Sequence, residues 1–263
     1  TECQGLVCSN GLAHDQIIET LAPQPRLLIF GAGYGFEVLA QAAWLTRCQV
    51  FYWGDIDTHG FAILDQLRAL GYRFFSDGDT EVILKAYAAW GEHCVERFHG
   101  MFAFAIWERD SGRLVLARDR LGIKPLYYGV TEDGFFLFGS ELKVLTGHPR
   151  FSKRIRDEAV EDYFAFGYVP DPKTIFCSAF KLPPGHTVRI GRQHRIPEPR
   201  KYWDVPFSPV VDADGDALDR ELIDRLKAAV DRRLIAEVPL GAFLSGGVDS
   251  SAIVAMMGQL STD

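Results

Sequence analysis

The stretch that decides the fold lies in the middle of the chain and reads Met101-Phe102-Ala103-Phe104-Ala105-Ile106-Trp107. Aromatic and small residues alternate along it, which is a pattern typical of a short β-strand. Similar runs follow at 114–117, 126–130 and 135–138, with Ser-Gly, Gly and Asp-Gly turns between them. A spacing of about ten residues with turn residues between the runs predicts antiparallel sheets.

Helical patterns flank these strands. Apolar residues recur at helical spacing over 80–90, 158–166 and 218–230, which predicts three helices. Eight prolines between 170 and 209 predict edge strands and connections, and the apolar run Val238–Leu244 predicts a buried strand. Helices and antiparallel sheets in separate stretches indicate an α+β fold.

Composition narrows the functional classes. The 263 residues are 48% hydrophobic and 24% charged, with a formal net charge of −7, which is typical of a globular chain and disfavours a long polyanion as partner. No apolar run reaches the roughly 18–20 residues that cross a membrane. The five dispersed cysteines form no C-x-x-C pair and favour a reducing cytoplasm. We expect a cytoplasmic protein that does not depend on a membrane or on nucleic acid.

The first 70 residues show a different pattern, in which apolar strands end in glycine turns or acidic residues and alternate with helices, as in an α/β segment. An apolar strand over 27–30 ends in a glycine turn, and a second strand over 50–53 is followed by Gly54-Asp55-Ile56-Asp57. Two carboxylates at a strand end suit a divalent metal ion such as Mg²⁺, so Asp55 and Asp57 are candidate ligands. The alternative is a capped strand–turn–helix without a metal.

The strongest functional signal is the loop Leu244-Ser245-Gly246-Gly247-Val248-Asp249-Ser250-Ser251, which precedes an apolar helical run. Adjacent glycines let backbone N–H groups converge on one point, and the start of the helix adds partial positive charge. Such a loop suits a pyrophosphate, although it lacks the spacing and the lysine of a Walker A loop. The alternative is a strand–turn–helix with an Asp or Ser cap.

This loop resembles the S-G-G-x-D-S loop of the N-type ATP pyrophosphatases (the PP-loop), which cleave ATP between the α and β phosphates. Other segments resemble glutamine-hydrolysing asparagine synthetase, and their order and gaps agree from about residue 66 to the end. These segments are Ser76–Leu84, Gly100–Ala105, Arg118–Tyr128, Ser140–Lys143, Gly167–Pro170, Lys181–Gly185 and Val238–Gly241.

The asparagine synthetase resemblance implies a partial α-β-β-α sandwich of the Ntn type over 71–208, a glutamine amidotransferase domain. The first strand, loop and helix of an ATP pyrophosphatase domain would follow over 209–263. The implied activity is ATP-dependent amidation of aspartate, through an aspartyl-adenylate, with ammonia from glutamine. Glutamine, aspartate and ATP would be the substrates and Mg²⁺ the cofactor, and a homodimer stays open.

The same resemblance implies site residues. Asp79 would hold the α-amino group of glutamine, with a helix N-cap as the alternative role. The residues that would bind ATP and its departing pyrophosphate are Leu244, Ser245, Gly246, Gly247, Asp249 and Ser250.

The chain also departs from that family. Residue 1 is Thr1 where the family has its nucleophilic cysteine, two glutamine-site segments are not seen, and the sequence ends 14 residues after Asp249. We therefore assign no catalytic residue and expect no glutaminase activity and an incomplete synthetase. We also expect at least one unpaired sheet edge over 74–190, which would leave Met101, Phe102 and Phe104 without cover unless residues 1–70 shield part of that edge.

Residues 20–70 resemble the Toprim domain of the Wadjet plasmid-defence nuclease subunit. That resemblance implies Mg²⁺ on Asp55 and Asp57 and makes a metal-dependent nuclease module the second functional hypothesis. The two resemblances meet inside Asp65–Tyr72, which favours a third hypothesis, an inactive chimera with a Toprim-like unit over 1–70.

Overall fold

The computed structural model describes the strands Leu6–Cys8, Leu28–Phe30 and Cys48–Trp53 and the ranges 60–75, 78–191, 198–207, 214–234 and 240–260. The first two of these strands, β1 and β2, pair in parallel. Asp55 and Asp57 lie outside the described residues. Within the described part of the chain, no helix is long and apolar enough to cross a membrane.

A five-stranded sheet lies at the centre of the fold, and all its neighbouring strands are antiparallel. The alternation seen in the sequence of β4 sorts its side chains. Phe104 and Ile106 face a core under the helices, whereas Ala103 and Ala105 face a second sheet. The strand order is β10 (Arg200–Lys201), β9 (His186–Ile190), β5 (Arg113–Arg118), β4 (Ala103–Glu108) and β3 (Cys48–Trp53).

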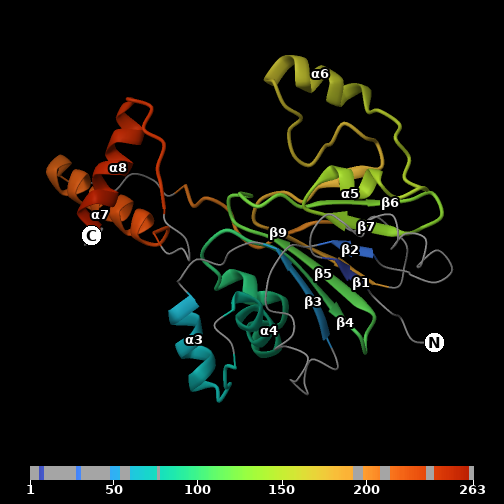
Figure 1. Cartoon of the computed structure of the whole chain (residues 1–263), viewed down its shortest axis with the longest axis horizontal. Coiled ribbons are helices and arrows are strands. Elements are labelled where there is room, and N and C mark those ends of the chain that lie inside the picture. The colour runs from blue at the N-terminus through green and yellow to red at the C-terminus, as the bar shows by residue number, and fades with distance from the viewer. Residues whose placement is uncertain are drawn as a thin grey trace.

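The second sheet has three antiparallel strands and packs on the first through the cluster that includes Leu116, Leu126, Phe138 and Val188. Its order is β7 (Phe136–Gly139), β6 (Tyr127–Val130) and β8 (Ala179–Lys181). Figure 1 shows α5 (Leu142–Thr146) over this sheet and α6 (Asp157–Phe166) farther out.

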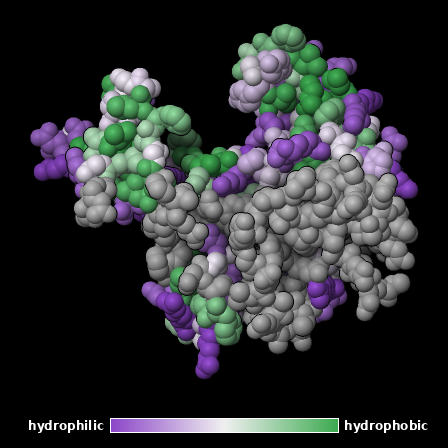
Figure 2. Space-filling view, viewed as in Figure 1, coloured by the Kyte–Doolittle hydropathy of each residue, from purple (hydrophilic) through white to green (hydrophobic). Residues whose placement is uncertain are grey.

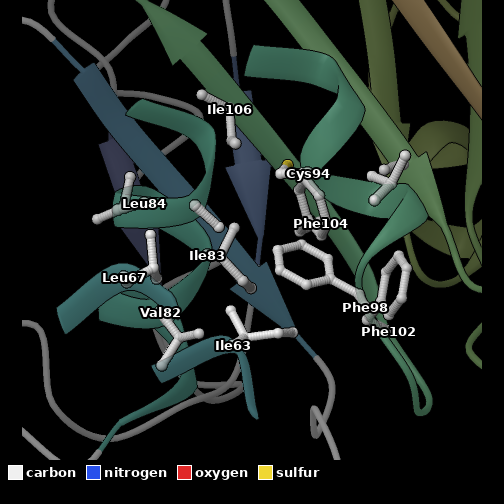
Figure 3. Packing of buried hydrophobic residues seen from close by; sticks show 13 residues of the cluster. Ile63, Leu67, Val82, Ile83, Leu84, Cys94, Phe98, Phe102, Phe104 and Ile106 are labelled. Carbon is white, nitrogen blue, oxygen red and sulfur yellow. The ribbon is translucent and has the colours of Figure 1, made fainter. Parts of the chain in front are cut away.

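Helices cover the outer face of the larger sheet. They are α3 (Gly60–Ala69), α4 (Asp79–Trp90) and the 3-10 helix η2 (Gly91–Glu96). Their apolar side chains surround Phe102 and Phe104, which are 0% and 1% exposed (Figure 3). The expected loss of cover at these two residues is therefore wrong. The layers run helix, sheet, sheet, helix, as an α-β-β-α sandwich does.

Strand β3, which lies within the N-terminal segment considered as a shield for this edge, supplies the cover. All six of its residues pair with β4, from Cys48 opposite Glu108 to Trp53 opposite Ala103. The sequence placed β3 in a separate unit, but it extends the central sheet and covers the edge of β4. Antiparallel pairing over 74–190 is confirmed, and among the described strands β3 and β10 end one sheet while β7 and β8 end the other.

The two helices at the C-terminal end, α7 (Gly215–Asp231) and α8 (Val248–Leu260), pack against each other. The prediction of a buried strand over Val238–Leu244 is wrong for residues 240–244, the part of it that the structure describes. Residues 240–244 form no strand, and Phe243 and Leu244 are exposed. A buried strand needs neighbours in its sheet and cover on both faces, and none of the described strands pairs with this segment.

Apolar surface remains on the peripheral helices. Figure 2 shows it over α6 and over the α7–α8 pair. On α6, Phe164 is 83% exposed and Phe166 is 62% exposed, and Leu222 of α7 is 57% exposed. The central sheets and α4 therefore form the well-buried part of the molecule.

Polar contacts fasten α4 to the end of β4. Tyr87 Oη donates a hydrogen bond of 2.6 Å to Glu108 Oε1, and Ser111 Oγ donates one of 2.6 Å to Oε2. Burial alone tends to raise the pKa of Glu108, but these two hydrogen bonds and Arg113 outweigh burial and leave that pKa below its ordinary value of 4.5. Burial and Glu108 together raise the pKa of Tyr87, so its hydroxyl keeps the proton that it donates.

We expect Tyr87→Phe to lower the free energy of unfolding by about 1 kcal/mol at neutral pH, because one hydrogen bond is lost. A carboxylate with a depressed pKa stabilises the fold above its unfolded pKa and loses that effect as the pH falls through the folded pKa. The difference between wild type and variant should thus shrink below pH 4.5. Urea unfolding of both proteins at neutral pH and at acidic pH measures this difference in the free energy of unfolding. A difference that grows on acidification would contradict the stabilising role of the Tyr87–Glu108 hydrogen bond.

Candidate functional site

Asp79 begins helix α4. Gly78 holds the N-cap position with extended backbone angles (φ −85°, ψ 141°) and makes no side-chain cap hydrogen bond. Asp79 is thus the first helical residue rather than the cap, at the end of the helix where partial positive charge favours a carboxylate. Its side chain is half-buried.

A buried ion pair holds this end of α4. Lys85 contacts Glu81 one turn below, and the two side chains are 3% and 2% exposed. Glu81 also accepts hydrogen bonds from the backbone N–H of Phe75, at 3.0 Å to Oε1 and 3.1 Å to Oε2. Lys85 donates to the carbonyl oxygen of Arg73 and lies 4.2 Å from the centre of the Phe74 ring. The pair therefore binds the chain before α4 to the helix that carries Asp79.

The segment after β5 is fixed by a carboxylate. Asp119 is fully buried, and its two oxygens accept hydrogen bonds from the backbone N–H groups of Leu121, Ile123 and Lys124 at 2.9–3.2 Å. Its backbone carbonyl accepts from Gly122 and from Gly185. Asp119 thus shapes a rigid turn beside the central sheet.

The neighbouring arginine extends this scaffold. Arg118 is 8% exposed and donates to the carbonyl oxygens of Leu182, at 2.6 Å, and Gly122, at 2.7 Å. It also forms an ion pair of 3.1 Å with Asp171. Arg118 and Asp119 both lie in the motif quoted from the sequence, but their anchoring role was not predicted. The signal that could have indicated it is the adjacent Arg118 and Asp119 between an apolar strand and a glycine turn.

The loop Ser245–Ser251 turns into α8, which begins at Val248. Gly246 has a φ of +80°, a left-handed backbone conformation that residues with a side chain rarely adopt. The space where a Cβ would lie is open. Ser245 Oγ and Ser250 Oγ are 2.8 Å apart, and Ser250 Oγ donates to the carbonyl oxygen of Gly247 at 3.2 Å. The hydroxyl pair closes the loop across the first turn of the helix.

This loop can bind an anion. A tight turn directly before a helix of 13 residues places backbone N–H groups and the positive end of the helix dipole together. The remaining loop positions, Leu244 and Val248, are exposed, at 61% and 85%. Asp249 lies in the first turn of α8, where its carboxylate could meet a cation that accompanies the anion. Among the described residues, no three His, Cys, Asp or Glu side chains form a preformed metal cage.

Two family models match the chain. The model of the glutamine amidotransferase domain matches residues 45–203, more than half of the sequence. The chain belongs to the glutamine amidotransferase domain family. The asparagine synthase model matches residues 221–263, which contain the loop before α8. The α+β sandwich is accordingly of the Ntn type predicted from the sequence.

Curated relatives agree with both matches. Asparagine synthetase [glutamine-hydrolyzing] 3 of Bacillus subtilis is 38% identical over 192 residues, which are 73% of this chain and 31% of that protein. Asparagine synthetase [glutamine-hydrolyzing] 1 of the same organism is 37% identical over 209 residues, 78% of this chain and 32% of that protein. The amidotransferase chain thus spans about a third of the length of these relatives.

A solved structure of glutamine phosphoribosylpyrophosphate amidotransferase from B. subtilis, in complex with ADP and GMP, is 14% identical. It covers 81% of this chain and 43% of its own, with a TM-score of 0.39.

The predicted site residues fall into separate regions of the amidotransferase chain. Asp79 begins α4 under the central sheet, whereas the residues from Leu244 to Ser250 lie at α8, which Figure 1 shows in the peripheral helix pair. Ser245 and Ser250 contact each other across the start of α8, and the binding of ATP or pyrophosphate by this loop stays a prediction. Asp55 and Asp57, the candidate metal ligands, lie outside the described residues.

Proposed function

We propose that this chain is the junction of a glutamine-hydrolysing asparagine synthetase. Residues 45–203 would contribute part of the glutamine amidotransferase domain, and residues 221–263 the phosphate-binding loop of the ATP-dependent domain. The observation that carries the proposal is the loop Ser245–Ser251, closed by the 2.8 Å hydroxyl pair and placed at the start of α8, inside the segment that matches asparagine synthase.

The loop would act on the leaving group. In the proposed reaction the β-carboxylate of aspartate attacks the α-phosphorus of ATP, and the bond to the pyrophosphate oxygen breaks. The aspartyl-adenylate then reacts with ammonia to give asparagine and AMP. The backbone N–H groups at Gly246 and Gly247, with the helix dipole of α8, would hold the departing pyrophosphate and its negative charge.

Mg²⁺ would accompany the ATP phosphates. Asp249 and Ser250 supply a carboxylate and a hydroxyl oxygen, which are ligands that this hard cation prefers, and their number fits an ion held mainly by substrate phosphates and water. The ion would neutralise charge on the phosphates.

On the other side of the junction, Asp79 would pair with the α-ammonium group of glutamine. A half-buried carboxylate at the first position of α4 can accept charge-assisted hydrogen bonds from such a group. The buried pair Glu81–Lys85 would keep that carboxylate in position by fixing the helix start.

The cellular setting completes the proposal. We place the protein in the cytoplasm, which agrees with the free thiols of Cys94 and Cys177. Soluble small molecules would be its substrates, without a membrane or nucleic acid, and the homodimer remains open to measurement. Nothing among the described residues favours the nuclease module over this function.

Calorimetric titration with Mg²⁺ and ATP tests the loop. We expect weak binding, on the order of millimolar, because the loop alone holds only the phosphates. Gly246→Ala should weaken it about tenfold, since a left-handed backbone costs a side-chain residue about 1–2 kcal/mol and the turn would open. Gly246 is chosen over Gly247 because a Cβ on Gly247 would meet only Ser245 Oγ, at an ordinary 3.5 Å.

The matched control for that titration is Gly258→Ala. Gly258 lies within α8, has open space for a Cβ and keeps a helical backbone, so its replacement should leave ATP binding intact. Equal affinities of the wild type and both variants would contradict the role of the loop.

A further inference from the structure

Three arginines converge on a pocket between the amidotransferase core and the end of α7. The pocket has a volume of about 180 Å³ and is lined by Arg120 and Trp203 on the core side and by Arg232 and Arg233 after α7. Arg120 lies more than 100 positions before Arg232 and Arg233 in the sequence, and no role was predicted for any of these arginines.

The positive charge of this pocket is not balanced by the described residues. No described carboxylate forms an ion pair with Arg120, Arg232 or Arg233, and the side chain of Arg232 makes no hydrogen bond to a described residue. The one carboxylate that lines the pocket, Asp119, already accepts three backbone hydrogen bonds. The lining thus holds three guanidinium groups against one carboxylate; the excess like charges repel one another, and a bound anion would offset that cost.

Arg120 has unused hydrogen-bonding capacity. Its Nε is buried and has no hydrogen-bond partner among the described residues, while its Nη2 donates to the carbonyl oxygen of Glu96 at 3.0 Å. Its guanidinium lies 5.6 Å from the centre of the Trp203 ring, which holds it at the pocket wall. A buried donor without an acceptor is costly, and an oxyanion in the pocket would satisfy it.

Arg232 and Arg233 differ in what they already bind. Arg233 Nη1 donates to the carbonyl oxygen of Ala229 at 2.9 Å and so serves the C-terminal turn of α7. Arg232 donates no hydrogen bond to a described residue and is half-buried, whereas Arg233 is exposed. Among the described residues, Arg120 and Arg232 are therefore the two half-buried arginines of the pocket with unused donors, and they belong to different parts of the chain.

We propose that this pocket binds a phosphoryl oxyanion, either inorganic phosphate or the phosphate of a small ester. Guanidinium groups that approach from several directions suit a tetrahedral group with several acceptor oxygens. The bound anion bridges the core to the end of α7. This inference is independent of the proposed function, since it concerns neither Asp79 nor the loop before α8.

The experiment is calorimetric titration of the whole chain with inorganic phosphate, with AMP and with aspartate, each against chloride at equal ionic strength. We expect phosphate or AMP to bind with an affinity on the order of millimolar. Arg120→Gln and Arg232→Gln should each weaken that binding about tenfold or more, because each removes a charge-assisted hydrogen bond. Phosphate should also raise the melting temperature of the wild type more than that of either variant.

The matched control is Arg220→Gln, which removes the same charge from an exposed position in α7 outside the pocket. It should bind as the wild type does. Gly246→Ala addresses the loop before α8 separately, because it leaves every arginine of the pocket in place. Absence of binding to the wild type, equal loss in Arg220→Gln, binding of aspartate alone, or a loss only in Gly246→Ala would each overturn the proposal. Circular dichroism of the variants without ligand shows that they are folded.

Discussion

Replacing Lys85 by methionine is expected to lower the free energy of unfolding by about 3–5 kcal/mol, because the substitution leaves the buried carboxylate of Glu81 without its partner. Both side chains are almost fully buried, at 3% and 2% exposed, so water cannot replace the lost contact. Such a loss is a large part of the roughly 5–15 kcal/mol that stabilises a typical domain. Urea unfolding of the two proteins measures the difference.

The chain offers a matched control with the same helical spacing. Arg225 and Glu221 form an exposed pair four residues apart in α7, and their side chains are 78% and 56% exposed. Arg225→Met should cost about 0.5 kcal/mol or less, because solvent screens exposed pairs. Glu81→Leu combined with Lys85→Met should cost less than the sum of the two single changes, since no charge is left buried. Equal costs at the buried and the exposed pair would contradict this account.

The second large effect is expected at Asp119. Asp119→Ala removes a fully buried carboxylate that accepts three part-buried backbone N–H groups, and each such donor left without a partner costs about 1 kcal/mol or more. We therefore expect a loss of about 3 kcal/mol or more in the free energy of unfolding, measured by thermal or urea unfolding.

Asp133 provides the comparison for this change. It also accepts hydrogen bonds in a turn, from Thr131 Oγ and Arg150, but it is exposed. Asp133→Ala should cost less than about 1 kcal/mol, because water can take over its contacts. If Asp119→Ala cost no more than Asp133→Ala, the turn after β5 would not depend on the buried carboxylate.

Local patterns predicted the local elements well. The alternation over Met101–Trp107 predicted β4, and the same alternation explains why phenylalanines face the helices and alanines face the second sheet. The apolar period over 80–90 predicted α4, and the run after Gly247 predicted α8. These features depend on neighbours a few residues apart, which a sequence displays directly.

Contacts between distant segments were beyond such patterns. The pairing of β3 with β4 joins residues that are about 50 positions apart, and Arg118 reaches Leu182 across 64 positions. The predicted strand before Leu244 failed for the same reason, because an apolar run becomes a strand only where partner strands meet it. Convergence of Arg120 with Arg232 also depends on tertiary structure alone.

The most direct test of the central claim follows the backbone amides of the loop before α8 by NMR while the chain is titrated with pyrophosphate and Mg²⁺. The account predicts that the Gly246 and Gly247 amide resonances shift most among the residues of this loop and of α8. In Gly246→Ala the shift at Gly247 should be lost. Resonances of Gly246 and Gly247 that stay in place at saturating pyrophosphate would contradict the claim that this chain carries the phosphate-binding loop of an asparagine synthetase.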